Sequence, residues 1–173
     1  MAVVSSDGVT SRSWRDVVGT LARLGLAAVW LVSGAIKAAD PMQTWAAVHA
    51  YQVLPPSAVE LVAAVLPWFE LALGVLLLIG LGVRHIAVIS GLVLLAFMAG
   101  VTQAWARGLS IDCGCFGGGG AVDPDKTSYG TELLRDTGFL VLAAWLIIRP
   151  RTLFALENVL TRGTDPDPGG GGT

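Results

Sequence analysis

Charged residues are scarce in this chain of 173 residues, at 14% of the composition, and the formal net charge is only −2. A soluble domain usually carries about a quarter charged residues, so the shortage excludes an ordinary soluble protein. The chain has no basic run and no aromatic stacking platform, which argues against nucleic acid as a partner. Hydrophobic residues make up 54%, and the mean hydropathy is +0.68. This composition predicts an integral membrane protein whose partner is the lipid bilayer.

Familiar catalytic motifs are missing as well. We find no Walker loop, dinucleotide fingerprint, nucleophile elbow or His-rich metal motif. The N-terminal residues contain no short apolar run followed by a small-residue cleavage site, so we expect no removable signal peptide. Covalent chemistry therefore depends on the two cysteines of the chain.

Four apolar segments are long enough to cross a hydrocarbon core of about 30 Å, and in lipid each must be helical. They run from about residues 17 to 37, 59 to 82, 85 to 105 and 131 to 148. The fourth is the least apolar, because Arg135 and Asp136 lie in its first turns. We predict an all-α, four-helix membrane bundle over residues 16–150. A polar tail (residues 1–15) precedes it, and a tail that is disordered from about residue 163 (residues 151–173) follows it.

Positive charges predict the direction of insertion. Arginines flank both chain ends and the short turn between the second and third spans: Arg12, Arg15, Arg23, Arg84, Arg149, Arg151 and Arg162. The positive-inside rule then places both termini in the cytoplasm. The loop of residues 106–130 would lie outside the cell membrane, where a thiol pair can be oxidised and stay so.

The two cysteines lie one residue apart in this loop, as Cys113-Gly114-Cys115. A disulfide between them would close a very small, strained ring, which the flexibility of Gly114 permits. A strained disulfide is reduced more readily, which favours a role as an oxidant over a permanent structural cross-link. Asp112 disfavours the thiolate of Cys113, and a nearby arginine, Arg107 or Arg135, would offset this effect.

Three interpretations of the cysteine pair stay open. Redox exchange with a client dithiol or a thioredoxin-like partner ranks first, because of the strain. A soft-metal site ranks second, since two sulfurs supply half of a tetrahedral site and His49 is the only other obvious ligand on that side. Inert thiols in a packed loop rank third. On balance we predict no metal.

Glu70 lies near the middle of the second span, where a carboxyl is costly unless it is protonated or paired. Candidate partners are Lys37 and Arg135, although Glu60, nearer the surface, is the better mate for Lys37. Glu70 either handles protons beside a quinone, together with Trp68 and Lys37, or only fixes the register of the helices. The quinone is a speculative cofactor, and the structural role is slightly favoured.

Several short motifs occur in an order that resembles the MauE branch of the DoxX-like membrane proteins. They are Ser33-Gly34-Ala35-Ile36-Lys37, Asp40-Pro41, Tyr51-Gln52-Val53-Leu54-Pro55, Leu66-Pro67-Trp68-Phe69-Glu70 and Asp112-Cys113-Gly114-Cys115-Phe116-Gly117. The resemblance covers roughly residues 17–150 and implies a four-helix membrane protein that supports maturation of a redox enzyme in methylamine utilisation. It also implies roles for Lys37, Glu70, Cys113 and Cys115, and more loosely for Arg135.

Two classes of function follow from these observations. The first is a membrane thiol–disulfide oxidoreductase, linked to a quinone or to a partner protein that accepts the electrons. The second is a non-enzymatic assembly factor that positions a redox enzyme. The client, the direction of electron flow and the oligomeric state stay open, and so does enzymatic activity itself.

Overall fold

A computed structural model describes residues 7–150, 152, 153, 155 and 156 of the chain. Residues 1–6 of the predicted N-terminal tail and the end predicted to be disordered lie outside the described residues. The chain is mostly helical, as predicted. The elements in chain order are α1 (Asp7–Ala39), α2 (Pro41–Ala50), α3 (Pro56–Ile79), α4 (Val83–Ala106), β1 (Ile111–Asp112), β2 (Gly120–Ala121), the 3₁₀ turn η1 (Pro124–Lys126) and α5 (Tyr129–Ile148).

Among the described residues, three helices are long and apolar enough to cross a membrane: Trp14–Ala39 within α1, Pro56–Ile79 and Val83–Ala106. The protein is therefore a membrane protein. Helix α5 occupies the place of the fourth predicted span and has 20 residues. It carries Glu132, Arg135 and Asp136 in its first two turns, which shortens its apolar run, so the fourth span stays a prediction.

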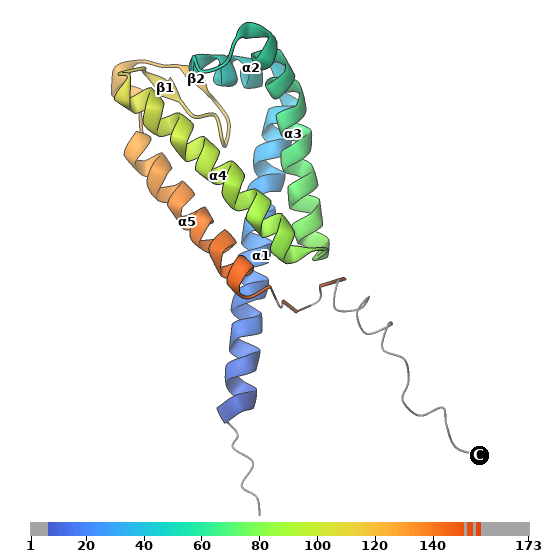
Figure 1. The fold of residues 1–173 in the computed structure, drawn as a ribbon. Helices are drawn as coiled ribbons and strands as arrows, with labels where there is room; N and C mark the ends of the chain where they lie inside the picture. Colours follow the sequence, from blue (N-terminus) through green and yellow to red (C-terminus); the bar gives the residue numbers. More distant parts are fainter. Residues whose placement is uncertain (1–6, 151, 154, 157–173) are drawn as a thin grey trace, which may run out of the picture.

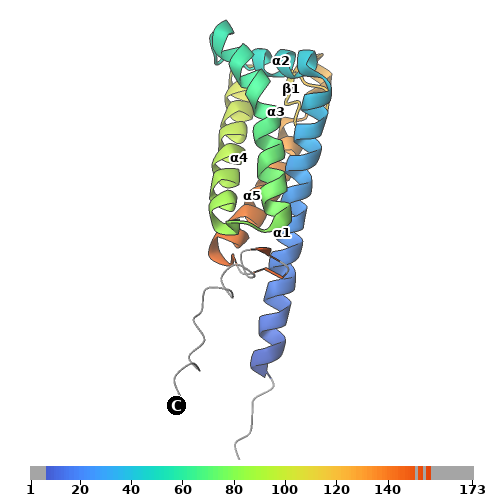
Figure 2. The same ribbon diagram turned by 90° about the vertical axis from the view of Figure 1, so that its right-hand side faces the viewer.

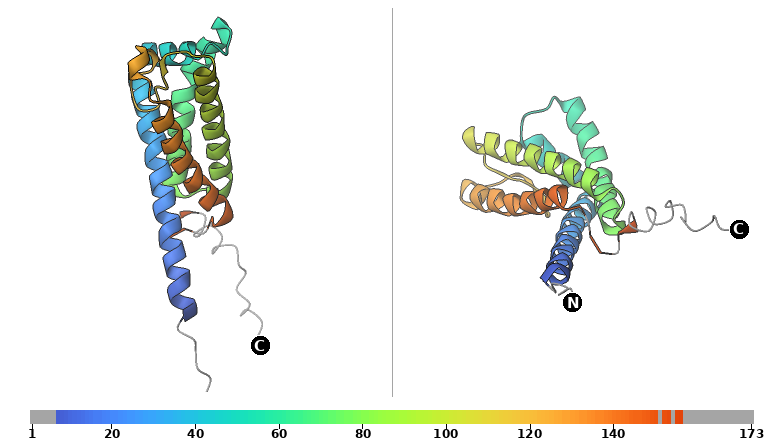
Figure 3. Two further views of the ribbon diagram at one scale, coloured as in Figure 1. Left: turned by 90° about the vertical axis from the view of Figure 1, so that its left-hand side faces the viewer. Right: turned by 60° about the horizontal axis from the view of Figure 1, so that its bottom comes forward.

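The helices form a bundle with two different ends (Figure 1). Helix α1 packs along α3, and α4 packs along α5; Figure 2 shows the first pair and the left view of Figure 3 shows α1 beside α5. At one end, called the turn end, residues 80–82 join α3 to α4. At the other, called the thiol end, α2 lies across the bundle beside the loop of residues 107–128. Helices α3 and α4 meet at the turn end and diverge toward the thiol end, so they are not a close hairpin.

Small residues let α1 and α3 approach closely. A Cβ atom added at Gly34 would lie 2.8 Å from the backbone oxygen of Pro67, and one added at Gly74 would lie 2.7 Å from Leu31 Cγ. Helix α3 runs through Pro67 without a break, from Pro56 to Ile79. Such contacts are how helices associate in lipid, where apolar burial alone gives no driving force.

Apolar side chains fill the bundle from its middle to the turn end. The indole nitrogen of Trp30 donates a hydrogen bond of 3.0 Å to the hydroxyl of Ser90, which ties α1 to α4 in the buried interior. The core residues are Ala22, Leu26, Ala27, Trp30, Leu73, Leu77, Val83, Ala87, Leu94, Ala143 and Leu146.

The cysteine loop is folded onto the thiol end. Its two short strands pair antiparallel, with Ile111 opposite Ala121. The hydroxyl of Tyr129 accepts a hydrogen bond of 3.1 Å from the Ile111 amide and donates one to the Leu109 carbonyl. The glycines at positions 117 to 120 all have positive φ angles, of 97°, 71°, 102° and 100°. Since other residues rarely adopt such angles, the glycine run is what allows this tight return of the chain.

Candidate functional site

The two cysteines follow β1, and both are free thiols. Cys113 is buried, at 9% exposed, and Cys115 is half-buried. Gly114 between them has a φ of 69°, and Ala47 of α2 packs so closely that a Cβ at Gly114 would lie 2.9 Å from it. Helix α2 therefore holds the loop in place, and the side-chain amide of Gln43 adds a hydrogen bond to the Gly119 carbonyl.

An arginine lies beside the first thiol. The Nη2 atom of Arg135 is 3.6 Å from the sulfur of Cys113 and 3.2 Å from the carboxylate of Asp136. Arg107, the other arginine considered, is exposed at the end of α4 and donates to the Gln52 carbonyl at 3.3 Å. Of the two predicted arginines, the fold thus brings Arg135 to the site and leaves Arg107 on the surface.

The two thiols differ in acidity. A hydrogen bond from Cys115 lowers the pKa of Cys113, and the bond from Arg135 acts in the same direction, against the effect of burial. The same hydrogen bond with Cys113, followed by burial, raises the pKa of Cys115 well above its ordinary value. Because the thiolate is the reactive form, Cys113 is the better leaving group and the more readily ionised thiol.

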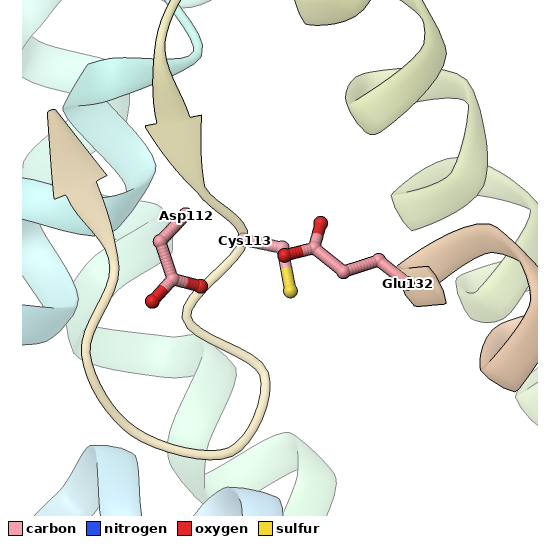
Figure 4. Close-up of side chains that lie close together, drawn as sticks. All are labelled: Asp112, Cys113 and Glu132. Carbon is pink, nitrogen blue, oxygen red and sulfur yellow. The ribbon is translucent and has the colours of Figure 1, made fainter. Parts of the chain in front are cut away.

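Two carboxylates lie close to Cys113. The ligand atoms of Asp112, Cys113 and Glu132 all lie within 4.8 Å of one another (Figure 4). The backbone amide of Gly114 donates to Asp112 Oδ1 at 3.2 Å, which orients the first carboxylate. Glu132, at 7% exposed, comes from the first turn of α5.

Sequence reasoning missed Glu132. The available signal was its spacing of one helical turn from Arg135, which puts both on one face of α5. The sequence did suggest His49 as a metal ligand. However, His49 is exposed on α2 and stacks on Trp45, with ring centroids 4.8 Å apart. His49 does not join the group of Asp112, Cys113 and Glu132.

A buried ion pair lies below the thiol end, between α1 and α3. Lys37 Nζ is 3.0 Å from Glu70 Oε2, and Ser33 donates a hydrogen bond of 2.9 Å to the same oxygen. Glu70 is fully buried. Of the two candidate partners of Glu70, the fold brings Lys37 to it, whereas Arg135 pairs with Asp136. The preference for Glu60 as the mate of Lys37 was wrong, because Glu60 is exposed, off the buried stripe of α3.

A cavity of about 450 Å³ opens at the thiol end, with walls from α1, α2, α3, α4 and the cysteine loop. Its lining is mostly apolar and includes Lys37, Tyr51, Leu66, Phe97, Cys113 and Cys115. The hydroxyl of Tyr51 donates to the Cys113 carbonyl at 3.4 Å, and burial raises the Tyr51 pKa, so this donor keeps its proton.

Two residues named as quinone contacts lie away from this cavity. Trp68 is 67% exposed on the outer face of α3, and Glu70 is buried behind Lys37. Neither lines the cavity, whereas Lys37 does. Any ligand in the cavity would therefore meet Lys37 and the two cysteines, while Glu70 lies behind Lys37 and accepts hydrogen bonds from its ammonium.

Comparison with known proteins identifies the family of this chain. The family model described as "Methylamine utilisation protein MauE" matches residues 15–149, from the first turns of α1 to the end of α5. No curated protein and no solved structure gave a match. The matched region contains the whole bundle, the cysteine loop and the Lys37–Glu70 pair, and the chain belongs to the MauE family.

Proposed function

We propose that this protein exchanges disulfides with a client at Cys113 and Cys115 and so supports maturation of a redox enzyme in methylamine utilisation. The family description supports the pathway. The observation that carries the chemistry is the pair of neighbouring thiols with opposite pKa shifts, held in a folded loop. A client that matures by forming disulfides needs an oxidant, and such a pair is suited to that task.

In the oxidising direction, a client thiolate attacks the Cys115 sulfur of a Cys113–Cys115 disulfide. Cys113 leaves as a thiolate beside Arg135, because the thiol of lower pKa leaves faster. A second client thiolate then attacks the mixed disulfide and releases Cys115. The client loses two electrons and two protons and gains a disulfide, and the cysteine pair becomes a dithiol.

The dithiol needs an electron acceptor before a second cycle, and we propose a quinone in the cavity at the thiol end. Two electrons and two protons pass from the dithiol to the quinone, which leaves a disulfide and a quinol. A volume of about 450 Å³ is typical of small-molecule sites, and both cysteines line it. Lys37 also lines the cavity, and its ammonium donates to both carboxylate oxygens of Glu70 at 3.0 Å, so a quinone oxygen would have to share one of these donors.

We further propose that α5 is a fourth span and that the thiol end faces outward across the cell membrane. The buried sides of α5 include Glu132 and Asp136, at 7% and 2% exposed, so these charges point into the protein rather than into lipid. The start of α1, the α3–α4 turn and the end of α5 share the turn end (Figure 1). Arg15, Arg84 and Arg149 belong to these segments, which favours a cytoplasmic turn end.

Trapping of mixed disulfides tests the exchange and its direction. In the oxidising direction the adduct forms only from the Cys113–Cys115 disulfide, so the wild type is tested with its pair oxidised beforehand. Mixed with a reduced dithiol peptide and quenched with acid, it should give a mixed disulfide on Cys115. In cells, Cys115→Ser should accumulate a client bound to Cys113 if the pair instead reduces its client, because the resolving thiol is then missing. The double Cys→Ser variant is the matched control. Full activity of that double variant, with no adduct in either experiment, would refute the exchange.

Topology has its own test. A membrane-impermeant maleimide added to intact, reduced cells should label the cysteines of the wild-type chain and leave the double Cys→Ser variant unlabelled. Labelling that requires opened cells would place the thiol end in the cytoplasm and remove the oxidising environment on which the proposal depends.

A non-enzymatic assembly factor is the second candidate. Apolar side chains are exposed at the thiol end, with Met42 at 76%, and Trp45 and Phe116 at 37% each. Such a surface suits a docked protein partner, such as a thioredoxin-like domain or a redox enzyme. A photo-crosslinker at Phe116 should then capture the same partner before and after both cysteines are replaced, and the double variant should keep its activity in cells.

A further inference from the structure

The carboxylates around Cys113 have fewer positive partners than their burial requires. Within the described part of the chain, the ion pairs are Lys37–Glu70, Lys126–Asp123 and Arg135–Asp136. Asp112 and Glu132 belong to none of them. The guanidinium beside Cys113, that of Arg135, is paired with Asp136, so no ion pair among these residues neutralises the carboxylates of Asp112 and Glu132. Such an excess of negative charge is costly unless protons or a cation neutralise it.

Among the described residues, two buried carboxylate oxygens of α5 near Cys113 have no hydrogen-bond partner, Glu132 Oε2 and Asp136 Oδ2. The first belongs to the group around Cys113, and Glu132 is 7% exposed. Figure 4 shows its carboxylate turned toward the sulfur of Cys113, with Asp112 on the other side of the loop backbone. An unsatisfied, buried carboxylate oxygen is expensive, so its position beside a thiol and a second carboxylate indicates a missing partner.

We propose that Asp112, Cys113 and Glu132 bind a thiophilic divalent cation of the Zn²⁺ type when the cysteines are reduced. Their ligand atoms lie within 4.8 Å of one another. Zinc–ligand bonds of about 2.0–2.3 Å hold ligand atoms roughly 3.3–3.8 Å apart, so the three side chains would have to draw together by about an ångström to close the site. Three protein ligands leave one position of a tetrahedral ion for water or for the neighbouring Cys115.

The donor set decides the class of ion. A thiolate disfavours Mg²⁺ and Ca²⁺, which prefer oxygen ligands alone. Two carboxylates disfavour Cu⁺, which prefers sulfur. A borderline cation such as Zn²⁺ accepts one sulfur and two oxygens. The positive charge of Arg135 opposes binding, but Asp136 neutralises it at 3.2 Å.

This inference goes beyond the proposed exchange, because it needs only the reduced thiol. Binding replaces the proton of the Cys113 thiol with the metal, giving a metal–thiolate bond and one released proton. Oxidation of the pair to a disulfide removes the thiolate ligand and so releases the ion. The bound ion would protect Cys113 from oxidation, and the redox state of the pair would set metal affinity.

Titration of Zn²⁺ into the full-length, untagged protein in detergent tests the site. The reduced wild type should bind one ion per chain by calorimetry, and protein oxidised at the pair should not. Glu132→Gln and Cys113→Ser should each weaken binding at least tenfold. The matched control is Glu60→Gln, which removes an exposed carboxylate from α3 and should bind like the wild type.

Cobalt provides the second measurement. Co²⁺ bound at this site should show a thiolate-to-metal charge-transfer band that Cys113→Ser and Glu132→Gln each diminish and the double Cys→Ser variant abolishes, in variants whose circular dichroism matches the wild type. Failure of the reduced wild type to bind Zn²⁺, or equal affinity of the wild type and both ligand variants, would overturn the site. The mixed-disulfide experiments report separately on the exchange. Zinc binding without any mixed disulfide would refute only the proposed function. A mixed disulfide without zinc binding would refute only the metal site.

Discussion

The turn end and the thiol end of the bundle are built in different ways. At the turn end and through the middle, α1, α3, α4 and α5 enclose an apolar core tied together by the Trp30–Ser90 hydrogen bond. At the thiol end, α3 and α4 diverge around a cavity, and a glycine-rich loop brings thiols and carboxylates together. The comparison shows that the apolar core and the candidate site lie toward opposite ends. Lys37 and Glu70, called the boundary pair, lie between the two ends. Glu70 is buried in the contact between α1 and α3, called the seam, whereas Lys37 lines the cavity.

Breaking the boundary pair should have the largest effect on stability. Glu70→Ala leaves the Lys37 ammonium buried without its partner, and we expect the free energy of unfolding to fall by about 3–5 kcal/mol. Thermal unfolding in detergent measures this loss. The double variant Lys37→Met with Glu70→Leu should recover most of it, and Glu60→Gln, on the exposed face, should change little. Equal melting temperatures for Glu70→Ala and Glu60→Gln would contradict a structural role for the pair.

Widening the seam between α1 and α3 should come next. The added methyl group of Gly34→Ala would lie 2.8 Å from the Pro67 carbonyl, which forces the helices apart. We expect a loss of about 1–3 kcal/mol in stability. Gly138 on α5 has open space around it, so Gly138→Ala should instead stabilise the helix by roughly 0.5–1 kcal/mol. Opposite signs in the two melting temperatures would support the close packing, and equal signs would argue against it.

A smaller loss tests the hydrogen bond inside the turn-end core. Trp30→Phe removes the donor that Ser90 accepts at 3.0 Å, and we expect a loss of about 1–3 kcal/mol, toward the lower end because the ring volume is partly kept. Adding Ser90→Ala removes the unpaired hydroxyl and should restore part of the stability. Cysteine alkylation should stay at the wild-type rate, since this change lies outside the thiol end. A changed alkylation rate would show that the two ends are coupled.

At the thiol end, the expected effect is on reactivity rather than stability. Alkylation requires a thiolate, and the pKa of Cys113 is lowered while that of Cys115 is raised. As pH rises from acid, Cys113 should therefore be modified first, and Cys115 only at higher pH, as followed by mass spectrometry of the reduced protein. Arg135→Gln should move Cys113 modification to higher pH and slow it severalfold at neutral pH. First modification at Cys115 would reverse the assignment of leaving group and attacking thiol.

The periodicity of hydrophobic residues predicted the helices well, because each span is set locally by composition and length. Lys37 and Glu70 were also candidates from the sequence, since a charged residue deep in a span requires a partner. The choice between Glu60 and Glu70 was wrong because it used depth alone. The buried stripe of α3 includes Val59, Ala63, Pro67 and Glu70, and Glu60 falls off this face.

Other features depend on contacts between distant segments. Glu132 joins Cys113 only because α5 packs beside the cysteine loop, and no local pattern connects the two residues. Trp68 belongs to the same sequence motif as Glu70, yet its side chain is exposed. Residues two positions apart on a helix face different sides. The divergence of α3 and α4 was not predicted either, as a short turn constrains only their adjacent ends.

By itself, the sequence determined a membrane protein of apolar helices with one closely spaced pair of cysteines, because hydrophobicity, chain length and cysteine spacing are local properties. Only the tertiary structure decided which charges meet, where the cavity opens and what surrounds Cys113. These outcomes depend on which face each helix turns to its neighbours, and in lipid that choice follows from close packing and pairing of polar groups rather than from apolar burial.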